Sequence, residues 1–135
     1  MVLQPDPIGD AGSRPAAGLA PDAFSCYKHA AMNPILILTT ADSPELARQI
    51  AGALVESGEA ACVNIVPGIR SIYRWEGKLC DEGELLLVIK SAAEKYEAAR
   101  MRIRSLHSYL VPEVIAIPIV AGDPAYLQWL QECLT

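Results

Sequence analysis

The stretch from residue 61 to residue 90 constrains the fold of this chain more than any other. Two runs rich in apolar residues lie on either side of the sequence WEGK at 75–78, which is the pattern of a long β-hairpin with a tight turn. In residues 69–75 the side chains alternate between two faces, one of which carries Tyr73 and Trp75. A hairpin of this length reaches beyond the core of a small domain, so its aromatic tip predicts a partner molecule.

Composition restricts the class of protein. The chain has 135 residues, of which 52% are hydrophobic, so it suffices for one domain and leaves apolar surface for association. No run approaches the roughly 20 apolar residues that a membrane helix requires. The net charge of −5 argues against a nucleic-acid partner, which would need a clustered basic surface. The composition therefore predicts a soluble oligomer without a membrane or nucleic-acid partner.

The cysteines and the N-terminal segment bear on the compartment. The four cysteines are widely spaced and show no CxxC pair, which favours a reducing cytoplasm over a zinc finger or a disulfide framework. Residues 1–31 are rich in proline and glycine and lack the basic start and apolar block of a secretion signal. We expect them to form a disordered tail, and Met32, just before the first predicted strand, is a candidate start of translation.

The next part of the chain predicts a strand, a helix and the hairpin. Residues 34–41 form a continuous apolar run with the length of a buried strand. A helix is expected to follow, with a capping box between Asp42 and Glu45 at its start and a glycine cap at Gly58. Within the hairpin, Pro67-Gly68 interrupts the first strand and predicts a bulge that steers the tip away from its own sheet.

The remaining residues repeat this pattern. Ser91 and Glu94 form a second capping-box signature, for a helix expected to end near residues 107–109. A strand over 114–120 and a short helix capped by Asp123 are expected to follow. The order βαββαβ plus a C-terminal helix predicts an α+β fold, a ferredoxin-like sandwich with both long helices on one face and a long β-hairpin arm. Another molecule must then cover the other face of the sheet.

Several blocks of sequence resemble the CutA family, which is named for divalent-cation tolerance. They are ACVNIVPG at 61–68, IYRWEGK at 72–78, Lys90 and HSYLVPEVIAIPI at 107–119. The resemblance extends over nearly all residues from Met32 to Leu134, so residues 32–135 are expected to form one CutA-like domain. It implies a homotrimer whose sheets pack around a threefold axis, with a non-catalytic role in the response to metal ions.

Three side chains are candidates for a metal site. Cys62 lies in an apolar strand, where an inert core thiol is the alternative. Cys80 lies among acidic residues, where a thiolate could bind copper or zinc, although neighbouring carboxylates raise the pKa of a thiol. His107 is the only histidine after residue 31, and its alternative role is a helix cap or a hydrogen bond to the backbone.

The resemblance implies how strong such a site would be. Copper binding in the family is associated with a cysteine at the end of the first strand and a histidine pair at the end of the second helix. The matching positions here are Thr39, Leu106 and His107. Because threonine and leucine do not replace a thiolate or an imidazole, we expect weak binding of copper or another divalent cation, dependent mainly on His107.

A second candidate site consists of aromatic and charged side chains that could hold a small ligand. Its members are Tyr73, Trp75, Lys90, Tyr109 and Glu113. Periodicity alone indicates that they pack the hairpin and an interface between molecules. The resemblance implies that they lie near clefts between subunits, where they could hold a small anionic ligand or a metal chelate.

Three classes of function are compatible with this second site: a non-catalytic binding protein, a signalling module and an enzyme. The sequence has no catalytic triad, phosphate-binding glycine loop or HExxH motif, so we expect no catalysis. The main alternative is a signalling module resembling the trimeric nitrogen-regulatory PII proteins, which bind nucleotides in inter-subunit clefts. A small isomerase or hydrolase would be favoured only if Tyr73, Lys90 and Glu113 converged in one pocket.

Overall fold

The computed structural model describes residues 32–134, so the expectations for residues 1–31 lie outside the described part of the chain. Its elements follow the order β1 (Pro34–Ala41), α2 (Pro44–Glu56), β2 (Cys62–Trp75), β3 (Lys78–Ala92), a 3-10 turn η2 (Ala93–Lys95), α3 (Tyr96–Leu106), β4 (Ile115–Pro118) and α4 (Pro124–Cys133). In residues 32–134 no helix combines the length and the apolar character needed to cross a membrane.

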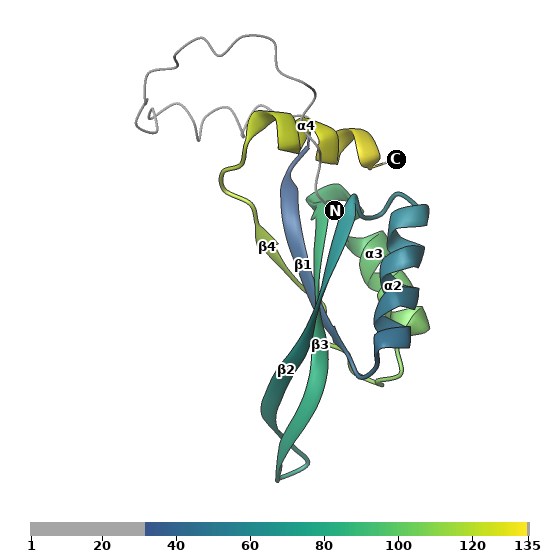
Figure 1. The fold of residues 1–135 in the computed structure, drawn as a ribbon, viewed down its shortest axis with the longest axis vertical. Coiled ribbons are helices and arrows are strands. Elements are labelled where there is room, and N and C mark those ends of the chain that lie inside the picture. Colours follow the sequence, from purple (N-terminus) through teal and green to yellow (C-terminus); the bar gives the residue numbers. More distant parts are fainter. Residues whose placement is uncertain (1–31, 135) are drawn as a thin grey trace.

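The four strands form one antiparallel sheet in the order β2-β3-β1-β4. Helices α2 and α3 lie on the same face of this sheet, and α4 lies at the end away from the hairpin tip (Figure 1). The predicted α+β ferredoxin-like arrangement is therefore confirmed, and the last strand lies at an edge of the sheet. That strand is shorter than expected, because pairing with β1 is confined to Ile115–Pro118.

The core lies between the sheet and helices α2 and α3. Side chains on one face of β1 and β3 alternate into it, and their largest members are fully buried, as are those of the helices: Ile37, Leu87, Ile89, Ile50, Leu54 and Ile103. Each such side chain contributes about 1.5–3 kcal/mol to folding. A smaller cluster of Met32, Ala61, Ala92 and Leu130 attaches α4 to the end of the sheet.

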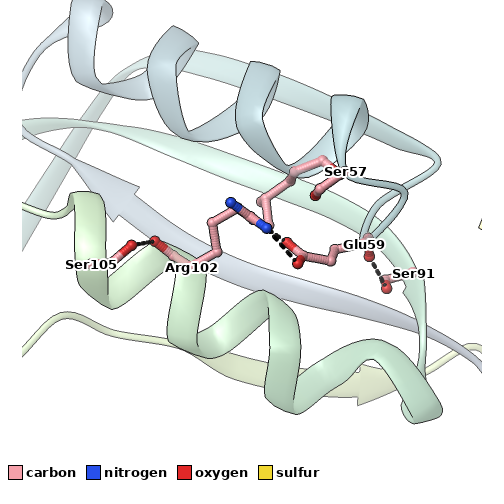
Figure 2. A network of polar contacts seen from close by, with 6 residues as sticks. Ser57, Glu59, Ser91, Arg102 and Ser105 are labelled. Carbon is pink, nitrogen blue, oxygen red and sulfur yellow. Dashed lines mark hydrogen bonds and ion pairs between the residues drawn. The ribbon is translucent and has the colours of Figure 1, made fainter. Parts of the chain in front are cut away.

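A half-buried ion pair joins α3 to the turn after α2. Arg102 donates to both carboxylate oxygens of Glu59, at 2.5 and 2.9 Å, and these hydrogen bonds lower the pKa of Glu59 (Figure 2). The carbonyl oxygen of Glu59 accepts a hydrogen bond from the Ser91 hydroxyl at 2.5 Å. Figure 2 shows this chain of contacts running between the two helices and the sheet. The pair is therefore a structural link between elements distant in sequence.

The helix starts differ from the predicted capping boxes. Ser43 caps α2 by accepting from the Leu46 amide at 3.2 Å, while Asp42 accepts a hydrogen bond from the Ser108 hydroxyl. Ser91 does not cap α3, because β3 continues through Ala92 and keeps Ser91 inside the strand. Both differences arise because a short polar side chain bonds wherever the fold offers a partner, and local spacing does not decide which.

The predicted bulge separates the hairpin into two halves. The β2–β3 register shifts between Val66 and Ile69, where Pro67 lacks an amide proton and Gly68 has a φ of 77°. Beyond it, Glu76 and Gly77 both have positive φ at the tip, as a two-residue hairpin turn requires. We call residues 69–84 the arm; it projects past the helices (Figure 1).

The sheet face opposite α2 and α3 is apolar. Residues paired directly across an antiparallel sheet share a face, and the register places seven apolar side chains together on this one. They are Leu36, Leu38, Val66, Leu86, Val88, Ile115 and Ile117, all half-buried or exposed. We call this surface the open face. It is the face that the sequence predicts another molecule must cover.

Candidate functional site

A buried carboxylate lies where the arm meets the body of the domain. Glu84 pairs with Ile69 just beyond the bulge, and by alternation along β3 it shares the open face with Leu86. Only 7% of Glu84 is exposed. Its Oε2 accepts a hydrogen bond of 2.7 Å from the hydroxyl of Tyr109, in the loop after α3. A carboxylate this deeply buried needs such partners, since an unpaired buried charge is strongly destabilising.

The cluster around Glu84 favours the ionised carboxylate. Burial raises its pKa, but hydrogen bonds from the side chains of Ser71, Tyr109 and Thr40 outweigh burial, so the net pKa is lowered. Burial and the contact with Glu84 raise the pKa of Tyr109. Tyr109 therefore stays protonated and donates a charge-assisted hydrogen bond, which is among the stronger kinds in proteins.

His107 ends α3 and holds the following loop. One ring nitrogen, Nδ1, accepts from the Tyr109 amide at 3.0 Å, so Nε2 carries the proton and donates to the carbonyl oxygen of Thr40 at 2.6 Å. The rings of His107 and Tyr109 lie 4.7 Å apart. Both imidazole nitrogens are engaged, so a metal ion binding there must replace one of these hydrogen bonds.

The arm carries the two predicted aromatic residues on the side that continues the open face. Tyr73 donates to Glu82 at 3.1 Å, and that hydrogen bond raises the pKa of the phenol. Trp75 is 52% exposed at the tip, opposite Lys78. Cys80 lies directly across from Tyr73. These side chains form a surface and not an enclosed site within one chain.

Lys90 lies at the far end of the open face. It is paired with Cys62 across the sheet, and its ammonium nitrogen is 4.0 Å from the Cys62 sulfur, with both residues half-buried. Lys90 and Cys80 are ten positions apart on β3, on the order of 30 Å of strand. The three cysteines in the described residues are free thiols.

Within one chain the predicted residues do not converge. The five ligand candidates lie in four separate places. Tyr73 and Trp75 are on the arm, Tyr109 is at the arm base, Lys90 is at the far end of the sheet, and Glu113 is exposed in the loop before β4. His107, Cys62 and Cys80 are likewise distributed over separate places. Across residues 32–134 there is no group of three His, Cys, Asp or Glu side chains arranged to hold a metal ion. Both candidate sites remain predictions.

A different set of residues does come together, around Glu84 at the base of the arm. The sequence analysis identified two of them, Tyr109 and His107, as site residues and missed three. The missed residues are Glu84, Thr40 and Ser71. One signal was available for Glu84: it is the acidic member of the alternating series that continues with Leu86 and Val88. An acidic residue in an apolar register indicates either an exposed strand end or a buried, partnered carboxylate.

Comparison with known proteins agrees with the fold and the sequence blocks. The family model of the CutA1 divalent ion tolerance protein matches residues 35–133. The divalent-cation tolerance protein CutA of Thermus thermophilus is 50% identical over 97 residues, which are 72% of this chain and 94% of that protein. Human protein CutA is 38% identical over 129 residues, covering 96% of this chain and 64% of the human one.

Solved structures of CutA1 proteins have the same fold as this chain. The crystal structure of CutA1 from Oryza sativa superimposes with a TM-score of 0.75 at 40% identity, covering 77% of this chain and 95% of that one. The Thermus thermophilus structure gives 0.74 at 47% identity, covering 76% and 99%. The chain spans 55% of the length of the chloroplastic protein CutA 1 of Oryza sativa. The chain therefore belongs to the CutA1 family of divalent-ion tolerance proteins.

Proposed function

We propose that this chain is a divalent-cation tolerance protein that acts as a homotrimer through binding and not through catalysis. The observation that carries the proposal is the apolar open face, which runs on into an arm bearing Tyr73 and Trp75. Covering such a surface removes several large apolar side chains from water, at about 25 cal/mol per Å². A second and third copy of the chain offer surfaces of matching character.

The assembly is tested by light scattering on the purified protein at micromolar concentration. We expect the mass of a trimer, and Trp75→Ala should lower the trimer fraction or the melting temperature. Met101→Ala is the matched control, because Met101 is a similarly exposed apolar side chain (61%) but lies on α3, away from the open face. A monomeric mass for the unmodified protein would overturn the proposal.

We further propose that copper or another divalent ion binds weakly, with His107 as the main ligand. The two hydrogen bonds that already engage its ring support weak binding, since a metal ion must displace one of them. Cys62 and Cys80 lie apart from His107 and from each other, so neither thiol offers a second soft ligand nearby.

Calorimetric titration with copper and zinc at pH 7 and pH 5 tests the metal proposal. Binding should be weak at pH 7 and disappear at pH 5, where imidazole is protonated. His107→Ala should abolish it, and Cys62→Ser and Cys80→Ser should leave it unchanged. Tight binding that survives His107→Ala and is lost in either cysteine variant would move the site into the hairpin.

A second candidate function is the binding of a small anionic ligand, as in PII-like signalling modules. Lys90 favours it, because its ammonium nitrogen lies 4.0 Å from the Cys62 sulfur and forms no ion pair with a carboxylate of the described residues. Titration with ATP or inorganic phosphate tests it, with Lys90→Met as the variant and exposed Lys78→Met as the control. Binding unaffected by Lys90→Met would exclude this site.

The thiols and the net charge bear on the compartment and on nucleic-acid partners. We propose a cytoplasmic protein, which the free thiols of Cys62, Cys80 and Cys133 support. Two plant relatives are named chloroplastic. The net charge of −5 supports the absence of a nucleic-acid partner.

A further inference from the structure

Three segments that are distant in sequence meet at the base of the arm. Thr40 comes from the end of β1, Ser71 and Glu84 come from the arm itself, and Tyr109 comes from the loop after α3. Tyr109 donates a hydrogen bond of 2.7 Å to the carboxylate of Glu84, and the side chains of Ser71 and Thr40 help to lower the pKa of that group. The arm is thus attached to the body by side chains as well as by its own strands.

The strands alone hold the arm weakly against bending. On β2 the ladder is interrupted between Val66 and Ile69, while β3 runs through the junction without a bulge. Past this point the arm is a two-stranded ribbon that pairs only with itself, and such ribbons are marginally stable and flexible without further contacts. The bulge therefore has the properties of a hinge, and Glu84 lies directly beside it.

We propose that Glu84 and Tyr109 form a latch that fixes the direction of the arm, and that its release frees the arm without unfolding the domain. The geometry supports a latch because the Tyr109 hydroxyl is the only donor to Glu84 that comes from beyond β1 and the hairpin among the described residues. His107 holds the backbone of Tyr109 in place through the Tyr109 amide. Movement of this loop would therefore withdraw the hydroxyl from the arm.

The latch also bears on assembly, and this consequence rests on the proposed homotrimer. An arm that must reach a neighbouring copy associates faster and more tightly when its direction is fixed beforehand, since less conformational freedom is lost on binding. The loop that holds the latch continues into Leu110 and Val111, which are strongly exposed. A molecule that contacted this loop would act on the arm through Tyr109.

Hydrogen exchange measured by mass spectrometry tests the latch in the full-length protein. Tyr109→Phe removes the hydroxyl and keeps the ring. We expect exchange at residues 69–72, 83–86 and 107–111 to become about ten-fold faster, with exchange in α2 unchanged. Tyr73→Phe is the matched control, because it removes an exposed hydroxyl from an otherwise similar pair with Glu82, and it should leave all these segments unchanged.

The outcomes separate the latch from the trimer. Unchanged exchange at the arm base in Tyr109→Phe, or faster exchange throughout α2 as well, would overturn the latch. Glu84→Gln, which keeps the shape and removes the charge, should accelerate the same segments by a smaller factor and covers the case in which Tyr109→Phe folds poorly. Light scattering on the same samples reports the trimer separately: a monomer with a normal latch response would overturn only the proposed assembly.

Discussion

The body and the arm contain the same kinds of contact in different surroundings. Tyr109 donates to Glu84 at 2.7 Å at the buried base of the arm, and Tyr73 donates to Glu82 at 3.1 Å on its exposed surface. Glu59 is held by an arginine in the body, and Asp81 is held by Arg70 on the arm. Both regions also carry large apolar side chains, which are fully buried in the body and largely exposed on the arm.

The difference teaches that the type of contact does not decide what it contributes. An exposed hydrogen bond or ion pair competes with water and contributes little, whereas a buried one must be kept because its loss leaves an unpaired polar group. The contacts of the body therefore stabilise the single chain. Those of the arm keep a surface in shape for another molecule.

The largest contrast should come from apolar side chains. Ile89 is fully buried and Ile72 is 67% exposed. Ile89→Ala should lower the free energy of unfolding by about 2–5 kcal/mol, because it leaves a cavity in the core. Ile72→Ala should change it by less than about 0.5 kcal/mol. Urea unfolding of both variants decides, and equal losses would mean that the arm is part of the folding core.

The ion pairs should differ in the same direction but by less. Arg102→Met leaves the mostly buried carboxylate of Glu59 without its partner and should cost about 1–3 kcal/mol of unfolding free energy. Arg70→Met breaks a pair whose side chains are 64% and 55% exposed, and should cost between about 0 and 1 kcal/mol. Thermal and urea unfolding provide the measurement. A larger loss from Arg70→Met would contradict the comparison.

Acid should weaken the fold through two largely shielded carboxylates, one in the body and one at the base of the arm. The pKa of Glu84 and that of Glu59 lie below the ordinary value of 4.5 in the folded chain. The ionised groups therefore stabilise the fold above about pH 4.5, and this stability is lost as the pH falls through the folded-state values. Urea unfolding between pH 6 and pH 3 should show the loss.

A variant separates the two carboxylates in that experiment. Glu84→Gln should reduce the acid-dependent loss without removing it, because Glu59 still titrates. Glu82→Gln, the exposed counterpart on the arm, serves as the control and should leave the pH dependence as it is in the unmodified chain. An identical pH profile for Glu84→Gln and the unmodified chain would mean that the cluster at the arm base does not stabilise the ionised form.

The smallest effect is expected at neighbouring threonines in β1. The buried hydroxyl of Thr39 has no hydrogen-bond partner in the described residues, so Thr39→Val should be neutral or stabilise by up to about 1 kcal/mol. Thr40→Val removes a hydroxyl that helps to lower the pKa of Glu84 and should destabilise. The melting temperatures should therefore move in opposite directions. A loss of stability in Thr39→Val would reveal a partner for that hydroxyl.

The sequence predicted the elements of the fold because their signals are local. The turn residues Glu76 and Gly77, the bulge at Pro67-Gly68 and the Asp123 cap each depend on a few adjacent residues, and the structure confirms all three. Hydrophobic alternation likewise placed the arm faces correctly. The end of β4 was less predictable, because strand length depends on the neighbouring strand and not on the residues alone.

The cluster at Glu84 could not be predicted in the same way. Its residues are separated by as many as 69 positions in the chain, from Thr40 to Tyr109, and only the completed sheet brings them together. The Ser91–Glu94 spacing is the opposite case. It is a capping-box signature, but Ser91 donates to the Glu59 carbonyl and does not cap the helix. Tertiary contacts decide which partner a short polar side chain finds.

The bulge at Pro67-Gly68 makes the length of the arm independent of the core. Because the strand register is set separately on each side of it, two residues added to each strand beyond Ile69 would preserve which face every arm side chain occupies and leave the packing of β1, α2 and α3 unaltered. One residue added to each strand would instead turn the outer aromatic side chains to the opposite face. The arm of this fold can therefore change length in steps of two residues per strand without any change in the core.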